Sequence, residues 1–168
     1  HARSVLHRDL KPANILVGAF GEVQIVDWGL AKVLSRGGVA DERKRRGDRE
    51  GSQIETVRNR PHASGSESLV GSVLGTPAYM PPEQARGDID HLDERSDVFS
   101  LGAILCEILT GAPPYASDTE TDDTLVLASR GDTSLALHRL REATADPELV
   151  RLCEECLTPA RQARPRNA

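Results

Sequence analysis

The hydrophobic and polar positions of this chain change their period along its length. Near the N-terminus, two short apolar runs, residues 15–17 and 23–26, flank a connection that contains Gly18 and Gly21. Glycine in such a connection is typical of a tight turn, because glycine adopts backbone conformations that other residues avoid. We therefore expect the two runs to pair as a short β-hairpin.

The second half of the chain shows helical periodicity instead. Apolar residues at positions 98, 101, 104, 105, 108 and 109 cover most of a helical circumference, which indicates a buried helix over residues 98–110. Ser96 or Asp97 can cap its start and Gly111 its end. An amphipathic helix is expected over 147–157, and a helix-like segment over 124–129.

Residues 35–72 have neither period. They are rich in Gly, Ser, Arg, Asp and Glu, which predicts a mobile loop. The basic run 43–46 is flanked by acidic residues, and we interpret it as part of a solvated mixed-charge loop rather than a nucleic-acid or import signal. The net charge of −5 also argues against a nucleic-acid partner.

Composition narrows the class of protein. Aromatic residues make up 3% of the 168 residues, so the core must be mainly aliphatic, and no apolar run approaches the length of a membrane span. Cys153 and Cys156 form a C-x-x-C without a second ligand pair, so buried thiols are favoured over a zinc site. With Cys106 the count is odd, which is typical of a reducing compartment, and we expect a cytoplasmic location. A membrane-anchored parent protein is compatible with this expectation.

The candidate chemistry lies beside the predicted hairpin. The octapeptide His7-Arg8-Asp9-Leu10-Lys11-Pro12-Ala13-Asn14 precedes the first run, and Asp27-Trp28-Gly29 follows the second. A lone Asp-x-Lys or Asp-Trp-Gly is usually a solvated turn, but the two together at this distance are specific. They resemble the catalytic loop and metal-binding turn of the protein kinase family, with Trp28 in place of the usual Phe.

The resemblance assigns roles in phosphoryl transfer. Asp9 would accept the hydroxyl proton, and Lys11 would supply positive charge where negative charge develops. Asn14 and Asp27 would bind Mg²⁺ through oxygen ligands, with ATP as the phosphoryl donor. Asp27 comes back beside the octapeptide if the two apolar runs pair. Leu16 resembles the residue that lies beneath the adenine ring.

Further positions resemble structural and regulatory residues of the family. His7 and Trp28 look like members of the hydrophobic spine that joins the two kinase lobes, and Gly29 completes the metal-binding turn. Arg8 resembles the family's arginine that commonly pairs with a phosphorylated residue in the activation loop. The hypothesis here is that this residue is one of Ser64, Ser66, Ser68 and Ser72.

Later motifs continue the resemblance. Residues 75–83 (Gly-Thr-Pro-Ala-Tyr-Met-Pro-Pro-Glu) are similar to the segment that closes the activation loop, with Pro81 where the family usually has Ala. By this resemblance Thr76 hydrogen-bonds the catalytic loop, Asp97 hydrogen-bonds its backbone, and Glu83 pairs with Arg164. Gly-Thr-Pro and the position of Lys11 resemble serine/threonine kinases rather than tyrosine kinases.

By this resemblance the chain is expected to be a partial kinase domain of bacterial serine/threonine type. Its fold would be mainly α (α+β overall), a helical large (C-terminal) lobe with one short hairpin. Its parts would be the catalytic loop 7–14, the activation segment 27–83 with a mobile insert at about 35–72, and the helical remainder 96–168. As part of the complete protein, it would transfer the γ-phosphoryl group of ATP to Ser/Thr hydroxyls of protein substrates.

The resemblance also marks what the chain lacks. It contains no G-x-G-x-x-G followed by a strand Lys, so the small lobe is expected to be absent and to be a required partner. The isolated chain should then be inactive or nearly so, because positioning supplies most of this catalysis. The alternatives are a non-catalytic remnant and a kinase-like binding module. Retention of the base, the cation and both metal ligands favours the kinase interpretation over them.

Overall fold

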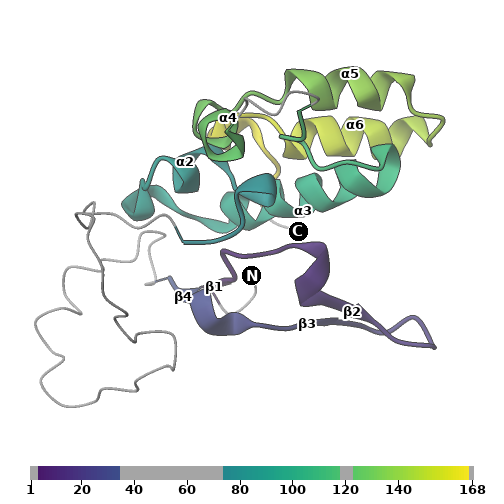
Figure 1. Cartoon of the computed structure of the whole chain (residues 1–168). Helices are drawn as coiled ribbons and strands as arrows, with labels where there is room; N and C mark the ends of the chain where they lie inside the picture. Colours follow the sequence, from purple (N-terminus) through teal and green to yellow (C-terminus); the bar gives the residue numbers. More distant parts are fainter. Residues whose placement is uncertain (1–3, 35–73, 118–122, 167–168) are drawn as a thin grey trace, which may run out of the picture.

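The structure, a computed structural model, describes residues 4–34, 74–117 and 123–166. Its helices lie together on one side, and its strands lie on the other (Figure 1). The helices are α2 (Pro82–Ala85), α3 (Glu94–Thr110), α4 (Thr124–Arg130), α5 (Ser134–Glu142) and α6 (Pro147–Cys156). The predicted fold class, mainly helical with a short hairpin, is confirmed. The predicted mobile insert at 35–72 lies outside the described residues.

The strands form antiparallel pairs. β2 (Ile15–Val17) pairs with β3 (Val23–Ile25), with Ile15 opposite Ile25, which confirms the predicted hairpin. Gly21 adopts φ 83° in its turn, a left-handed conformation that glycine tolerates without strain. β1 (Val5–Leu6) pairs with β4 (Lys32–Val33), so the chain returns beside its own start after the hairpin.

Helix α3 begins earlier than its apolar pattern predicts. Asp93 is the N-cap, and its side chain accepts a hydrogen bond from the backbone N–H of Arg95 at 2.9 Å. The cap predicted at Ser96 or Asp97 is therefore wrong, because both residues lie inside the first turns and their side chains bond elsewhere. The predicted end is confirmed at Gly111, whose φ is 79°.

The main core lies where α3 packs against α6. A Cβ atom at Gly102 would lie 2.5 Å from the Cβ of Cys156, so this close approach of the two helices requires glycine. Cys153 and Phe99 are fully buried here, and the rings of Phe99 and Tyr115 stack with centroids 6.1 Å apart. All three cysteines are unpaired and buried, which confirms the buried thiols predicted at Cys153 and Cys156.

One helical expectation needs correction. Ile108 in the last turn of α3 is 73% exposed, so the predicted burial around the circumference does not reach the end of this helix. The amphipathic helix expected over 147–157 is confirmed as α6. Its buried face is formed by residues 153 and 156 with Leu157 beyond the end, whereas Leu149 and Leu152 are about half exposed. Helix α5 was not predicted from its pattern. Within the residues that the structure describes, no helix has both the length and the apolarity that crossing a bilayer requires.

Candidate active site

The loop formed by residues 7–14 is held through its backbone. The N–H groups of His7 and Arg8 donate to the two carboxylate oxygens of Asp97 at 2.7 and 2.9 Å, and the carbonyl of Arg8 accepts from the side-chain amide of Gln84 at 2.8 Å. Arg8 has φ 68°, a left-handed conformation that costs a non-glycine residue about 1–3 kcal/mol. Contacts on both sides of this residue therefore fix the backbone that leads into Asp9.

Asp97 reaches this loop from α3. It is 3% exposed, and burial raises the pKa of its carboxyl group, whereas the hydrogen bonds from the His7 and Arg8 backbones act in the opposite direction. The contact expected from the family resemblance is present. A buried carboxylate that accepts charge-assisted bonds from two backbone donors is a strong anchor for the loop.

Replacing Asp97 with asparagine should lower the free energy of unfolding by about 1–3 kcal/mol, because the amide NH₂ would face a backbone N–H and leave it without an acceptor. A denaturant midpoint measures the change. The matched control is Asp90→Asn at an exposed position, where little change is expected. Equal midpoints for the two variants would contradict this role.

The side chain of Asp9 lies in a hydrogen-bonded cluster. Its Oδ2 accepts from the Lys11 ammonium at 2.9 Å, and its Oδ1 accepts from the Thr76 hydroxyl at 2.9 Å. Lys11 also donates to Thr76 Oγ1 at 2.8 Å, and Asn14 Nδ2 donates to the Asp9 carbonyl at 2.8 Å. The Asp9 side chain is 10% exposed and that of Lys11 25%. The cluster therefore presents an oriented carboxylate and a cation, both still open to solvent.

The hairpin brings Asp27 back to this cluster. The N–H of Val26 donates to the carbonyl of Asn14 at 2.9 Å, which places the next residue, Asp27, beside the loop. Asp27 has φ 60° and ψ 63° and precedes η2 (Trp28–Leu30). A Cβ at Gly29 would lie 3.2 Å from Asp27 Oδ1, so glycine leaves room for this carboxylate.

His7 contacts the turn that carries Asp27 through the Val26 carbonyl and the Trp28 ring. His7 Nε2 lies 3.0 Å from the carbonyl of Val26, and its Nδ1 accepts from the N–H of Asp9 at 3.3 Å. One tautomer, with the proton on Nε2, satisfies both bonds. The His7 and Trp28 rings meet edge to face at 4.8 Å, and Trp28 is half exposed. The histidine therefore links the 7–14 loop to the turn that carries Asp27.

Asn14 and Asp27 are suitable ligands for a magnesium ion. Because Asn14 Nδ2 also approaches Asp9 Oδ2 at 3.3 Å, the Oδ1 of the same amide points away from Asp9. Within the described ranges, no group of three or more His, Cys, Asp or Glu side chains is arranged as a metal site. One carboxylate and one amide suit Mg²⁺, which commonly takes its remaining ligands from water and substrate phosphates.

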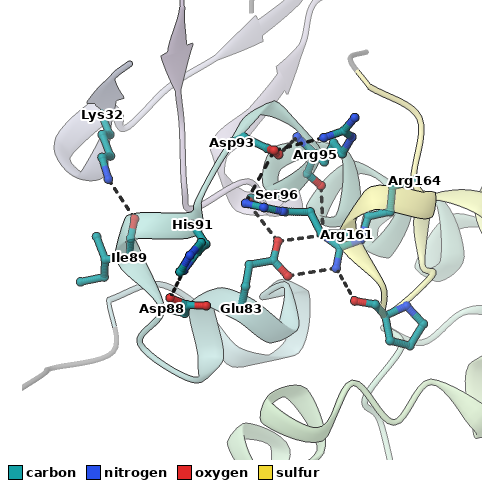
Figure 2. Close-up of polar contacts among 11 residues, drawn as sticks. Lys32, Glu83, Asp88, Ile89, His91, Asp93, Arg95, Ser96, Arg161 and Arg164 are labelled. Atoms are coloured by element: carbon teal, nitrogen blue, oxygen red, sulfur yellow. Dashed lines mark hydrogen bonds and ion pairs between the residues drawn. The ribbon is translucent and has the colours of Figure 1, made fainter. Parts of the chain in front are cut away.

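Glu83 and Arg164 form the buried ion pair that the sequence predicted (Figure 2). The guanidinium donates to the two carboxylate oxygens at 2.8 and 3.0 Å, and Ser96 donates to Glu83 at 2.9 Å. Both charged residues are less than 5% exposed. The pair fastens α2, and with it the end of the 75–83 segment, to the helical layer.

Other predicted positions can be placed individually. Leu16 is 52% exposed on β2, so its apolar surface is open to a ligand. Arg8 Nε donates to the carbonyl of Leu30. The four serines proposed as phosphorylation sites, Ser64, Ser66, Ser68 and Ser72, lie outside the described residues.

Sequence reasoning missed three tertiary contacts, of which the first reaches the 7–14 loop. Gln84 bonds the loop, and Tyr79 donates to Glu107 at 2.7 Å. In the third contact, which Figure 2 shows, Lys32 donates to the carbonyl of Ile89 at 2.9 Å. Burial and the Glu107 carboxylate raise the pKa of Tyr79 to about 12. Lys32 follows closely after the Asp27 turn, but no pattern marked it as buried.

Comparison with known proteins gives consistent matches. A family model described as "Protein kinase domain" matches residues 1–167. Serine/threonine-protein kinase PknB from Mycobacterium tuberculosis is 36% identical over 119 residues, which are 71% of this chain and 14% of PknB. PknB from Mycobacterium leprae is 39% identical over 119 residues, covering the same shares. Serine/threonine-protein kinase PknD from Chlamydia trachomatis is 44% identical over 115 residues, 68% of this chain and 12% of PknD. The chain thus spans about a seventh of the length of these relatives.

Proposed function

The chain belongs to the protein kinase family, and we propose that the full-length protein transfers the γ-phosphoryl group of ATP to serine and threonine hydroxyls of other proteins. The observation that carries the proposal is the hydrogen-bonded cluster of Asp9, Lys11 and Thr76 beside Asn14. Similarity to two bacterial serine/threonine kinases supports the same class of acceptor.

In the proposed step, the substrate hydroxyl oxygen forms a bond to the γ-phosphorus while the bond to the β-phosphate bridging oxygen breaks and ADP leaves. Asp9 accepts the hydroxyl proton. A carboxylate oxygen has two lone pairs. Among the described residues, Oδ1 accepts a bond from Thr76 alone, which leaves a lone pair for the substrate. Lys11, bonded to the other oxygen, supplies positive charge next to the transferring group.

Asn14 and Asp27 would hold Mg²⁺, which neutralises charge on the phosphates. The protein's part is to fix these two ligands. Asn14 is 5% exposed and bonded to Asp9, whereas Asp27 lies between Val26 and Trp28, which both contact His7. Leu16 would contact the adenine ring from the hairpin.

The nucleotide also needs a cover that these 168 residues do not encode, because they contain no Gly-rich loop followed by a strand lysine. We therefore propose a small lobe of the same kinase as partner. It would cover the exposed apolar side chains of the hairpin, among them Leu16, Val17 and Val23. The 168-residue chain alone should be inactive or nearly so. The use of ATP and three unpaired cysteines favour a cytoplasmic setting for the reaction.

The test is label transfer from γ-labelled ATP to dephosphorylated casein by the full-length protein, with Mg²⁺ and with excess chelator. We expect label on Ser and Thr in the presence of Mg²⁺ only, and little or none from the 168-residue chain. Absence of transfer by the full-length protein, transfer that survives chelation, or label confined to Tyr would contradict the proposal. Tight ATP binding without transfer would instead favour a binding module.

A further inference from the structure

One side-chain amide joins the two segments that form the Asp9 cluster. Gln84 lies in α2 and is 6% exposed. Its Nε2 donates to the carbonyl of Arg8 at 2.8 Å and to the carbonyl of Leu74 at 2.7 Å. An amide NH₂ has two hydrogens, so the donor capacity of Gln84 is filled by these two carbonyls.

The two carbonyls are placed immediately before the reacting cluster. Arg8 precedes Asp9, and Leu74 is separated from Thr76 by Gly75 alone. Thr76 and Asp9 then bond each other directly at 2.9 Å. The amide therefore fixes the spacing of two backbones whose next side chains must meet.

Gly75 shows how closely the backbones approach. It has φ +124°, and a Cβ there would lie 2.8 Å from Gln84 Nε2 and 3.3 Å from the Arg8 carbonyl oxygen. Such contacts are too short for any side chain to be accommodated without movement. The segment thus passes over the loop in direct contact, with the Gln84 amide at the crossing point.

Gln84 stands on a rigid support. Its own N–H donates to the carbonyl of Pro81 at 3.0 Å, and the preceding residue, Glu83, forms a bidentate ion pair with Arg164. On the opposite side of Arg8, Asp97 accepts the N–H group while Gln84 donates to the carbonyl. The peptide groups on both sides of this left-handed residue are therefore fastened to the helical layer.

We propose that Gln84 is a positioning residue for phosphoryl transfer, which sets the spacing between the 74–76 segment and the 7–14 loop and so orients the Asp9 carboxylate. The proposal rests on the proposed kinase function. Gln84 touches no reacting atom, so it acts through Thr76 and the loop backbone. Its loss should therefore lower kcat and leave the KM for ATP nearly unchanged.

Two substitutions separate the hydrogen bonds from the volume of the side chain. Gln84→Glu keeps the shape but turns a carboxylate oxygen toward two carbonyl oxygens. Gln84→Met keeps a similar length and removes the donors without adding charge. We expect kcat to fall about 10- to 100-fold in the Glu variant and by a smaller factor in the Met variant, because displacements near 1 Å have effects of this size. Gln162→Glu, the same chemical change at an exposed residue of η5 (Arg161–Ala163), is the control.

Amide hydrogen exchange on the full-length protein gives a readout independent of activity. Exchange in the segment 74–80 should be about 10-fold faster in both Gln84 variants, while the amides of α6 keep the wild-type rate. If the wild-type protein transfers no phosphoryl group, the kinase proposal fails. Hydrogen exchange alone then decides whether the Gln84 amide holds the 74–76 segment against the 7–14 loop.

Three results would overturn the proposal: kcat and exchange equal to those of Gln162→Glu, an equal acceleration of exchange in α6, or a rise in the KM for ATP in place of the fall in kcat. If the Glu variant does not fold, the Met variant carries the same measurements.

Discussion

Replacing Asp9 with asparagine is expected to lower kcat of the full-length protein about 10²- to 10⁴-fold, the range that loss of a general base produces. The amide cannot take up the substrate proton at neutral pH. Its oxygen can still accept from the Thr76 hydroxyl, which Asp9 now does at 2.9 Å, so the change removes chemistry and leaves most of the packing. Single-turnover transfer from γ-labelled ATP measures the effect on the chemical step.

The control for this variant is Asp90→Asn, the same change at an exposed position in η4 (Ile89–His91), which should transfer phosphate at the wild-type rate. The KM for ATP should also stay within about twofold in Asp9→Asn, because Asp9 is not among the proposed nucleotide ligands. A kcat within a factor of about 10 of wild type would remove Asp9 from the role of base.

Replacing Arg164 with alanine should lower the free energy of unfolding by about 3–5 kcal/mol, which corresponds to roughly 10 °C in Tm for a protein of this size. Without the guanidinium, the Glu83 carboxylate would be a buried charge with Ser96 as its remaining described donor. The change also removes hydrogen bonds to the carbonyls of Thr158, Arg95 and Pro159, and a guanidinium that lies 4.8 Å above the Phe99 ring.

The chain offers a matched control for this experiment. Arg151 and Glu155 form an ion pair at 2.9 Å, close to the 2.8 Å of the buried pair, but their side chains are 81% and 46% exposed. Arg151→Ala should therefore change the free energy of unfolding by less than about 1 kcal/mol.

In addition, Glu83→Ala combined with Arg164→Ala should destabilise less than the sum of the single changes, because the double variant leaves no unpaired charge. Additive effects, or an Arg164→Ala Tm equal to that of Arg151→Ala, would contradict the assigned role of the pair.

The parts that the sequence predicts are those marked either by a local pattern or by a family motif. The two apolar runs on either side of Gly18 and Gly21 specify the hairpin, and the hairpin returns Asp27 to the 7–14 loop. The Glu83–Arg164 pair spans 81 residues and has no local signal, so it was predicted by family resemblance. In each case the prediction concerns a motif whose residues have one common structural role.

The predictions fail where residues of ordinary type act through tertiary contacts. Ser96 and Asp97 look like caps, but their oxygens bond Glu83 and the loop backbone, and Asp93 caps the helix instead. Helix α5 packs Ala136, Leu137 and Leu140 against the core, but Leu135 beside them is about half exposed, which blurs the apolar face in the sequence. Gln84 carries no motif, because an amide that bonds two distant carbonyls is indistinguishable in sequence from a surface glutamine.

The contact between Asp97 and the backbone of the 7–14 loop has a consequence for the order in which the chain can fold during synthesis. His7 lies 90 residues before Asp97, and a ribosome that adds about 5–20 residues per second needs roughly 5–18 s to produce this interval. The hairpin can pair within microseconds, long before then. The 7–14 loop thus leaves the ribosome when the hairpin can already pair but Asp97 has not yet been synthesised. Chaperones that bind nascent chains can reach the loop during this interval.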